Sequence, residues 1–391
     1  DFEEIATTQW NDRTFQWEHP SASGPVGRIE TTALKPLLND FITFGKNQLG
    51  AHQVLSIIEE AYANHSNLAQ ATRYWVHQVF GQSGLIVIDG DDAALKQSAS
   101  ALFKQELFDE GLEQLTSEAC AKLKKEFHLQ VNPRPINLFY IADGVRQRIV
   151  SKDSGFATAD QAMHWTEKEM QALIEEDTSC LSPNAIFRPL YQESILPNLM
   201  YLGGGGELAY WLQLKAGFEG FGLEFPLLQL RDSFHWVDEK IMRRLKDLDV
   251  SPEEYFQSAE EWVKSKVLAN HERKQELEQG RAELRRALDA MLASLGDSYP
   301  ELEQSIHAEK ARMERSFKRL EKKISRGLKG REKDKVEALY RWHNALWGAS
   351  LQERSQNILS LWTLGCEALW SEMQQVSPWP GGKFHLISIK P

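Results

Sequence analysis

One short stretch of the chain carries four side chains with different hydrogen-bonding chemistry. Arg188 is a cation, Tyr191 a phenol, Gln192 an amide and Glu193 a carboxylate, and the amide of Asn198 follows shortly after. Arginine binds carboxylates and phosphates through paired hydrogen bonds, and the other groups can orient a polar ligand or take part in proton transfer. The alternative is that Arg188 and Glu193 belong to an ordinary ion pair, at the surface or partly buried. Arg188, Gln192 and Glu193 are therefore candidate catalytic residues, and Tyr191 and Asn198 are candidate substrate-binding residues.

Four consecutive glycines, Gly203, Gly204, Gly205 and Gly206, stand before a segment with helical character, residues 207–215. The first amides of a helix lack internal partners and the helix dipole favours negative charge, so such a turn can bring N–H groups close to a phosphate or carboxylate. Neither the dinucleotide-binding fingerprint nor the lysine of a Walker motif is present. A plain tight turn is the alternative.

Acidic residues open the chain. Asp1, Glu3 and Glu4 could hold a substrate amine or a magnesium ion, because hard carboxylate oxygens suit both. The alternative is that these acids lie near the positive end of a solvated helix. Because the first residue is Asp1 rather than an initiator methionine, we expect that a segment upstream has been lost.

Histidine and cysteine offer little chemistry. The histidines are scattered, and no His-x-x-x-His or Cys-x-x-Cys pair has metal-ligand spacing. Three widely separated cysteines, Cys120, Cys180 and Cys366, argue against a disulfide framework and favour a reducing cytoplasm. A lone cysteine is more often a small buried hydrophobe than a nucleophile. We expect neither a metal site built from these residues nor covalent catalysis.

The composition limits the class of protein. The 391 residues are too many for one ordinary core, and an apolar share of 42% is enough to build two domains. A net charge of −11 opposes binding to nucleic acid, which calls for a basic patch. No apolar run approaches the roughly 18 to 20 residues that span a bilayer, and no leader peptide opens the chain. We expect a globular protein of the cytoplasm with no nucleic-acid or membrane partner.

Apolar runs bounded by glycines predict the strands that must position these side chains. Residues 84–90 read as a buried strand that ends in Asp89, Asp91 and Asp92, acids that could serve a ligand or simply form a turn. A second run, residues 137–144, also ends in Asp-Gly. Residues 199–202 lead into the glycine turn, and residues 225–230 stop at Arg231. This alternation predicts an α/β fold with a mainly parallel sheet, whose carboxyl edge binds ligands.

Residues 253–348 are rich in Glu, Lys and Arg, with apolar residues spaced three and four apart, which is typical of a coiled coil. Two apolar seams separated by a turn signal at residues 296–300 predict an antiparallel helical hairpin. The seams are Leu277, Leu284, Leu288, Met291 and Leu295, and Met313, Phe317, Leu320 and Ile324. Residues 351–373 predict another helix and residues 383–389 a closing strand.

Several of these motifs together resemble the signature of the bacillithiol cysteine-adding enzymes, the BshC family. The similarity is strongest in residues 181–184, 188–193, 195–198, 203–207 and 209–211. It extends to residues 1–5, 25–29, 85–92, 137–139 and 351–354, so it covers the whole chain.

The resemblance implies a Rossmann-like nucleotide-binding core with inserted connecting segments and a coiled-coil domain that promotes a homodimer. It also implies amide formation between the carboxyl group of cysteine and the glucosamine amine of glucosaminyl-malate. A carboxyl group does not condense with an amine unaided in water, so ATP or another nucleotide, together with magnesium, is expected to activate it. The family's amino-terminal portion, with a Thr-Gly-Gln-Gln-type motif and an acidic-histidine pair, is absent from this sequence.

The implied ligand chemistry assigns roles to the candidate residues. Glucosaminyl-malate carries two carboxylates and an activated cysteine carries phosphate, so Arg188 and Arg231 are expected to clamp anions. Tyr191, Gln192 and Asn198 are expected to orient the sugar. Glu3 and Glu4 are further candidate catalytic residues, one of which is expected to hold the incoming amine. Further assignments are Asp1, Tyr210 and Trp211 to the substrate, and Arg231 with Gly203, Gly204, Gly205 and Gly206 to the cofactor.

The predicted division of the chain is a Rossmann-like core at 1–252, a helical hairpin at 253–348, and a helix and strand at 349–391 that return to the core. Two classes of function remain open. A ligase depends on the polar residues at the sheet edge, whereas a coiled-coil scaffold or a nucleotide-binding protein without ligase chemistry depends on other parts. Deletion of the hairpin would separate the ligase from the scaffold.

Overall fold

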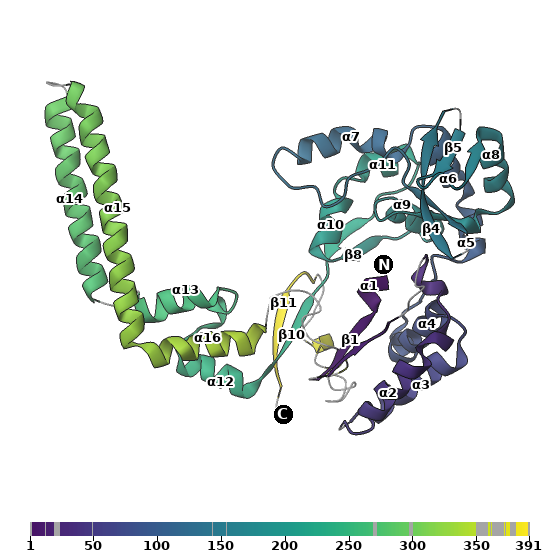
Figure 1. The fold of residues 1–391 in the computed structure, drawn as a ribbon, viewed down its shortest axis with the longest axis horizontal. Coiled ribbons are helices and arrows are strands. Elements are labelled where there is room, and N and C mark those ends of the chain that lie inside the picture. The colour runs from purple at the N-terminus through teal and green to yellow at the C-terminus, as the bar shows by residue number, and fades with distance from the viewer. Residues whose placement is uncertain are drawn as a thin grey trace. The chain divides into compact units, whose positions relative to one another are not determined.

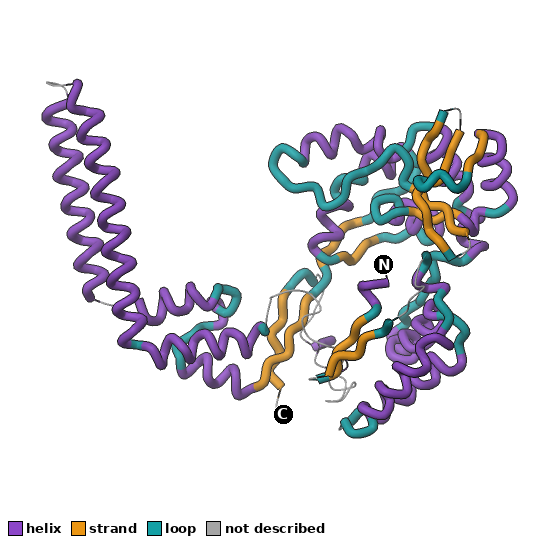
Figure 2. Tube along the Cα trace, in the orientation of Figure 1, coloured by secondary structure: helices purple, strands orange, loops and turns teal. Residues whose placement is uncertain are grey.

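The computed structural model describes residues 2–11, 13–18, 24–48, 50–142, 144–153, 155–268, 272–296, 300–348, 359, 361, 371, 373–375 and 381–389. The chain divides into two compact units, Asp1–Ser233 with Asn357–His385, and Phe234–Gln356 with Leu386–Pro391. Figure 2 shows that the described part of the second unit is almost entirely helical, whereas the first mixes helices and strands.

The first unit begins with a small helical layer (Figure 1). A two-stranded antiparallel sheet precedes three amphipathic helices, and Trp10, Phe15 and Phe41 are buried where they pack together. The Asn67 side chain accepts a hydrogen bond from the Gln70 amide and begins the last of these helices. The elements are α1 (Phe2–Ile5), β1 (Thr7–Trp10), β2 (Arg13–Gln16), α2 (Lys35–Gly45), α3 (His52–Asn64) and α4 (Leu68–Phe80), with 3-10 turns at Val26–Arg28, Thr31–Leu34 and Gly81–Ser83.

A five-stranded sheet forms the centre of the first unit, in the order β6-β5-β4-β3-β7. Its strands are β3 (Leu138–Ala142), β4 (Val145–Lys152), β5 (Gly155–Thr158), β6 (His164–Thr166) and β7 (Leu181–Pro183). Neighbouring strands are antiparallel throughout. The surrounding helices bury Phe103, Leu138 and Met170 in one core. They are α5 (Ala93–Ser98), α6 (Ser100–Phe108), α7 (Leu112–Leu123), α8 (Glu167–Glu176), α9 (Arg188–Ile195), α10 (Gly205–Trp211) and α11 (Lys215–Gly220).

A separate parallel pair flanks the glycine turn, as the sequence predicts. Strand β8 (Met200–Gly203) runs parallel to β9 (Leu227–Leu230), with Gly203 opposite Leu230. The Arg231 amide donates to the Gly203 carbonyl at 3.0 Å, which extends the ladder by one bond. Both strands therefore end at the same edge, where the glycine turn and Arg231 begin.

Two predicted strands differ from expectation. Residues 84–90 form no strand, because no described strand pairs with this segment to complete its hydrogen bonds. Ile86 is 81% exposed. Residues 138–142 do form a strand, but Gly144, at φ 73°, turns the chain directly into β4. A tight turn of this kind gives an antiparallel neighbour, whereas a parallel one requires a long crossover. The five-stranded sheet is thus antiparallel rather than parallel as predicted, whereas β8 and β9 form a parallel pair.

The second unit contains the predicted hairpin. Helices α14 (Glu272–Gly296) and α15 (Pro300–Arg331) lie side by side (Figure 1), and the ion pairs Arg281–Glu314 and Lys310–Asp289 show that they are antiparallel. Leu284 and Leu320 in its seams remain 37% and 46% exposed. The side chains of Leu277 and Leu295, the turn at residues 297–299 and most of the helix predicted at 351–373 lie outside the described residues.

Shorter helices pack near the base of this hairpin around Trp262, Leu339 and Trp347, which are buried. They are α12 (Glu239–Asp247), the 3-10 turn Pro252–Glu254, α13 (Ala259–Val263), the π-helical turn Lys264–Leu268 and α16 (Lys333–Trp347). The predicted closing strand is present as β11 (Phe384–Ile389), paired with β10 (Ser233–Asp238). Within the described ranges, no helix is both long enough and apolar enough to cross a membrane.

Candidate functional site

A polar cavity of about 920 Å³ in the first unit gathers part of the predicted site. Arg188, Tyr191 and Gln192 line it, as does Asp91, which directly follows the predicted strand at residues 84–90. The Arg28 side chain, which sequence reasoning left out of the site, lies in the same lining.

A series of hydrogen bonds that starts at two buried polar groups, Glu106 and Asn137, positions helix α9, which carries three of these side chains. The Glu106 carboxylate accepts hydrogen bonds from the Asn137 backbone and side-chain nitrogens at 2.8 and 2.9 Å. The Asn184 side chain in turn donates to Asn137 Oδ1 at 2.8 Å, and Asn184 Oδ1 accepts from the Ile186 and Phe187 amides at 3.1 and 3.0 Å. The start of α9 is therefore anchored to the buried core.

Tyr191 is held as a neutral phenol at the cavity wall. Its hydroxyl donates to the Gly90 carbonyl at 3.0 Å. Burial, together with the charges of Asp91, Asp92 and Asp89, raises the pKa of Tyr191 to about 12. The phenol can thus donate or accept a hydrogen bond near neutral pH, but it cannot serve as a phenolate base.

Glu193 and Asn198 bind each other instead of facing this cavity. Glu193 is 3% exposed, and its carboxylate accepts from the Asn198 amide at 2.5 Å and from Asn198 Nδ2 at 3.1 Å. Neither residue lines the cavity. In this arrangement the pair braces the turn between α9 and β8, so any part it plays in ligand binding is indirect.

The predicted anion clamps meet at a residue that was not predicted as part of the site. Glu207 Oε2 lies 3.6 Å from Arg231 Nη1, and Glu207 Oε1 lies 3.9 Å from Arg188 Nη2. Arg188 Nη2 also donates to the Tyr210 hydroxyl at 3.1 Å, and the Tyr201 hydroxyl donates to Glu207 Oε1 at 3.1 Å. Two arginines, two phenols and one carboxylate therefore form a connected polar network at the carboxyl edge of β8 and β9.

The four glycines have different surroundings. The Gly204 amide donates to Glu207 Oε2 at 2.9 Å. A Cβ atom on Gly203 would lie 2.7 Å from Tyr201 Cε1, whereas one on Gly205 or Gly206 would meet nothing within 4 Å. Close packing thus explains glycine at position 203, and open space lies beside positions 205 and 206.

Trp211 is placed in the core rather than at a surface. It is fully buried, and its ring stacks on Tyr201 with 4.0 Å between centroids. Its contribution to a site is therefore to support Tyr201. Tyr210 is also buried, at 8% exposure, and reaches the network through its hydroxyl.

The acidic opening of the chain is only partly described. Asp1 lies outside the described residues, and Glu3 and Glu4 belong to helix α1, although their side chains are outside the description. Their expected role in holding an amine stays a prediction.

A second ion network, formed by Arg28, Asp91 and Lys96, lines the polar cavity. The Arg28 guanidinium donates from Nε to Asp91 Oδ2 at 2.5 Å and from Nη2 to Asp91 Oδ1 at 3.0 Å. Lys96 Nζ donates to Asp91 Oδ1 as well, and both cations bind the Ser179 carbonyl, at 3.2 and 3.0 Å. Burial raises the pKa of Asp91, but the hydrogen bonds and charges of Arg28 and Lys96 outweigh this effect and hold that pKa below its usual range.

The cysteines and the acids offer no other site among the described residues. Burial, with the nearby Asp177 charge, raises the pKa of Cys180 to about 11, so its thiol is protonated near neutral pH. No group of three His, Cys, Asp or Glu side chains in the described ranges is arranged to hold a metal ion.

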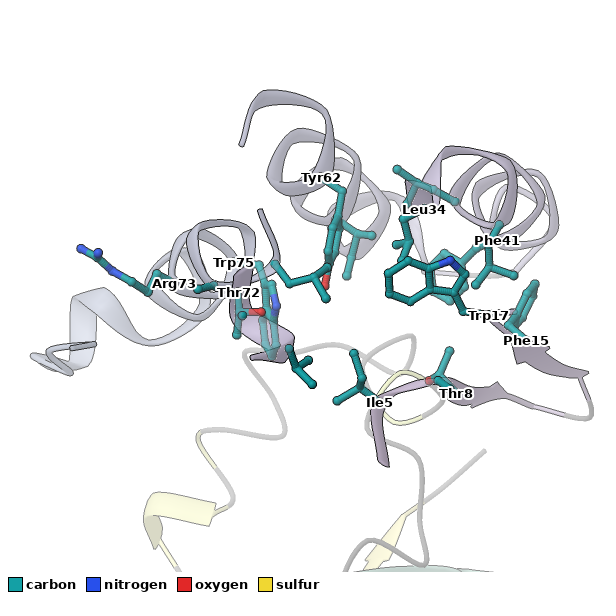
Figure 3. Close-up of a pocket in the computed structure, with 18 of the residues that line it drawn as sticks. Ile5, Thr8, Phe15, Trp17, Leu34, Phe41, Tyr62, Thr72, Arg73 and Trp75 are labelled. Carbon is teal, nitrogen blue, oxygen red and sulfur yellow. The ribbon is translucent and has the colours of Figure 1, made fainter. Parts of the chain in front are cut away.

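An apolar cavity of about 570 Å³ (Figure 3) shares lining residues with the polar one. Trp17, Tyr62 and Trp75 line it, and Arg73 points away from it. Gly27, Ala69, Ile88 and Asp89 line both cavities, so the same segments separate an apolar compartment from a polar one.

Comparison with known proteins identifies relatives along the whole chain. The family model described as "Bacillithiol biosynthesis BshC, N-terminal Rossmann-like domain" matches residues 1–232, and "Bacillithiol biosynthesis BshC, C-terminal coiled-coil domain" matches residues 234–389. These matches confirm the predicted Rossmann-like and coiled-coil classes.

Individual relatives agree with these family matches. A Flavobacterium psychrophilum protein named "Putative cysteine ligase BshC" is 33% identical over 384 residues, which are 97% of this chain and 71% of the relative. Proteins of the same name from Flavobacterium johnsoniae and Christiangramia forsetii are 32% and 31% identical, and the matches cover 91% and 97% of this chain and 67% and 71% of the relatives.

Proposed function

The chain belongs to the bacillithiol biosynthesis BshC family, and we propose that it is the ligase that joins the carboxyl group of cysteine to the amine of glucosaminyl-malate. In this reaction a bond forms between the cysteine carbonyl carbon and the sugar nitrogen. The nitrogen loses a proton, and one carboxylate oxygen of cysteine leaves with the activating group. The product is the thiol bacillithiol.

The observation that carries this proposal is the convergence of Arg188 and Arg231 on Glu207 at the edge of β8 and β9. Arg188 also lines the polar cavity, so it links that cavity to the network. Both the malate carboxylates and an activated cysteine are anionic. Two guanidinium groups set against one carboxylate leave a local positive charge, which favours such ligands in a chain whose net charge is −11.

Tyr191 and Gln192 line the cavity beside Arg188 and are suited to orient sugar hydroxyls. Asn198 takes a supporting part, through its bonds to Glu193. Glu3 or Glu4 is proposed to hold the incoming amine. These roles divide the site into an anion-binding part and a sugar-binding part.

ATP or another nucleotide is the proposed activating co-substrate, with magnesium as its expected companion. When bound, it supplies the phosphoryl or nucleotidyl group that makes the carboxylate oxygen able to leave. The residues at the sheet edge fit an anionic group: Arg188 and Arg231 carry charge, and space is open beside Gly205 and Gly206. Glu207 opposes this charge, so we assign the phosphate contacts chiefly to the two arginines.

Reconstitution tests the function. The purified protein is incubated with cysteine, glucosaminyl-malate and each nucleoside triphosphate in turn, with magnesium, and the thiol product is identified by labelling and mass spectrometry. Formation of bacillithiol that depends on one nucleotide supports the proposal. If no nucleotide yields the amide, and the protein also fails to restore bacillithiol to a strain that lacks its own ligase, the proposal is overturned.

The assembly and location of the protein are proposed on separate grounds. The partly exposed leucines of α14 and α15 favour a homodimer through the hairpin, since two-fold dimers are the commonest assembly. The described cysteines Cys120 and Cys180 are free, which suits a reducing cytoplasm.

A further inference from the structure

The network of Arg28, Asp91 and Lys96 is built around a buried cation. Lys96 is 1% exposed, and burying a charge without a partner is costly. Asp91 compensates it, together with the Ser179 carbonyl. A buried lysine that binds one carboxylate and one carbonyl holds both groups in fixed positions. Lys96 therefore fixes the position of Asp91 at the cavity wall.

Asp91 in turn orients Arg28. Its two oxygens bind Nε and Nη2 in the paired geometry that a planar guanidinium favours. The Arg28 side chain remains 45% exposed, and within the described residues Nη1 has no hydrogen-bond partner. Arg28 is therefore held on one edge and offers N–H donors on another.

The charge of the cavity lining agrees with an anionic ligand. Arg28, Lys96 and Arg188 are cations, whereas Asp89 and Asp91 are the carboxylates among the lining residues. One positive charge is left over in an otherwise acidic chain. Arg28 and Arg188 come from segments 160 positions apart in sequence, yet they line the same cavity of about 920 Å³.

We propose that Arg28 binds one carboxylate of the malate group and that Arg188 binds the other carboxylate. Asp91 and Lys96 are the positioning residues that hold Arg28 in place. This inference deepens the proposed function and rests on it for the identity of the substrate. The dicarboxylate itself can be tested without the ligase reaction, because malate alone carries the chemistry that Arg28 would recognise.

The first experiment measures binding of L-malate to the protein by calorimetry, for the wild type, Arg28→Gln, Arg28→Lys and Lys96→Met. Loss of the charged hydrogen bonds from Nη1 weakens binding by roughly tenfold to a hundredfold, and lysine cannot keep the paired contact with Asp91 while it also reaches the ligand. Arg13→Gln is the matched control, because Arg13 forms an equivalent exposed ion pair with Asp40 but lines neither cavity. Its malate affinity should equal that of the wild type.

The second experiment measures KM for each substrate. Arg28→Lys should raise KM for glucosaminyl-malate and leave KM for cysteine unchanged, a selective effect that a general loss of structure would not produce. Lys96→Met should show the same selectivity in protein whose circular dichroism is native.

The outcomes separate this inference from the proposed function. If malate binding depends on Arg28 but the protein forms no amide, the proposed ligase function is overturned and the anion site at Arg28 is supported. Ligase activity with wild-type malate affinity and KM in Arg28→Gln overturns the inference alone. Inorganic phosphate is titrated into the same proteins. If Arg28→Gln loses phosphate binding but keeps its malate affinity, the assignment of Arg28 to a dicarboxylate is overturned.

Discussion

Glu207 Oε2 accepts a 2.9 Å hydrogen bond from the backbone N–H of Gly204, so a carboxylate of the protein itself occupies this amide at the start of α10. The same side chain lies within ion-pair distance of Arg188 and Arg231. A ligand anion at this edge must therefore compete with Glu207 for positive charge, and the arginines rather than the helix decide how strongly it binds.

Glu207→Gln tests this competition. The amide oxygen of glutamine can still accept the bond from Gly204, but the negative charge between the two arginines is gone. Binding of pyrophosphate, measured by calorimetry, should tighten several-fold, with little change in thermal stability. Glu224→Gln, which neutralises an exposed acid elsewhere, is the control. Unchanged or weaker binding in Glu207→Gln would show that Glu207 does not oppose the ligand.

Arg188→Lys should lower kcat/KM for thiol formation by far more than the retained charge suggests. Arg188 serves Tyr210 and Glu207 at once, and lysine lacks the planar fork for both. The expected loss is on the order of 1.5 to 3 kcal/mol if one charged hydrogen bond is forfeited. Arg244→Lys, at an exposed ion pair in the second unit, should be neutral. Wild-type thiol formation by the Arg188→Lys, Arg231→Lys double variant would leave both arginines a structural role only.

Gly205→Val and Gly203→Ala should have opposite profiles. A side chain at position 205 meets open space, so the variant should keep its melting temperature but weaken binding if a ligand approaches the turn. A methyl group at 203 would lie 2.7 Å from Tyr201 Cε1, so that variant should melt at a lower temperature. Calorimetric scans and nucleotide titrations measure the two effects. Unaltered binding in Gly205→Val would return the turn to a purely structural role.

Leu284→Glu combined with Leu320→Glu should dissociate the proposed dimer, because each places a charge in a partly exposed apolar seam. Light scattering at micromolar concentration measures the mass. The control is Ala293→Glu with Ala311→Glu, which adds the same charges at exposed positions on the opposite faces of α14 and α15, about 180° around each helix. It should leave the mass unchanged. A wild-type monomer under these conditions would contradict the dimer.

Asp91 should make stability depend on pH in the acid range. Its pKa is depressed in the folded protein, so its ion pairs stabilise the fold above the unfolded-state pKa, near 3.8, and this contribution is lost as the pH falls through the folded-state pKa. Asp91→Asn should therefore be less stable than the wild type at pH 7, with a difference that narrows below about pH 4. Thermal unfolding at a series of pH values measures it. Parallel curves for the two proteins would contradict this role.

The local sequence pattern was sufficient to predict the elements that depend mainly on residues close together in the sequence. Apolar spacing predicted the hairpin of α14 and α15, and the run before the glycines predicted β8 together with the turn that follows it. A helix completes its hydrogen bonds within its own segment, so periodicity is a good guide to it. The parallel partner β9 was also evident, because it too is a short apolar run that stops at a charged residue.

Only the tertiary structure decided the rest. Residues 84–90 have the composition of a strand, but a strand needs a neighbour to accept its hydrogen bonds, and none lies beside them in the described chain. The sequence by itself determined the family, the hairpin and the importance of Arg188. It could not show that Arg28 and Asp91, 63 positions apart, share a paired hydrogen bond over a buried Lys96. Contacts between distant segments depend on how whole elements pack, and no short-range pattern records them.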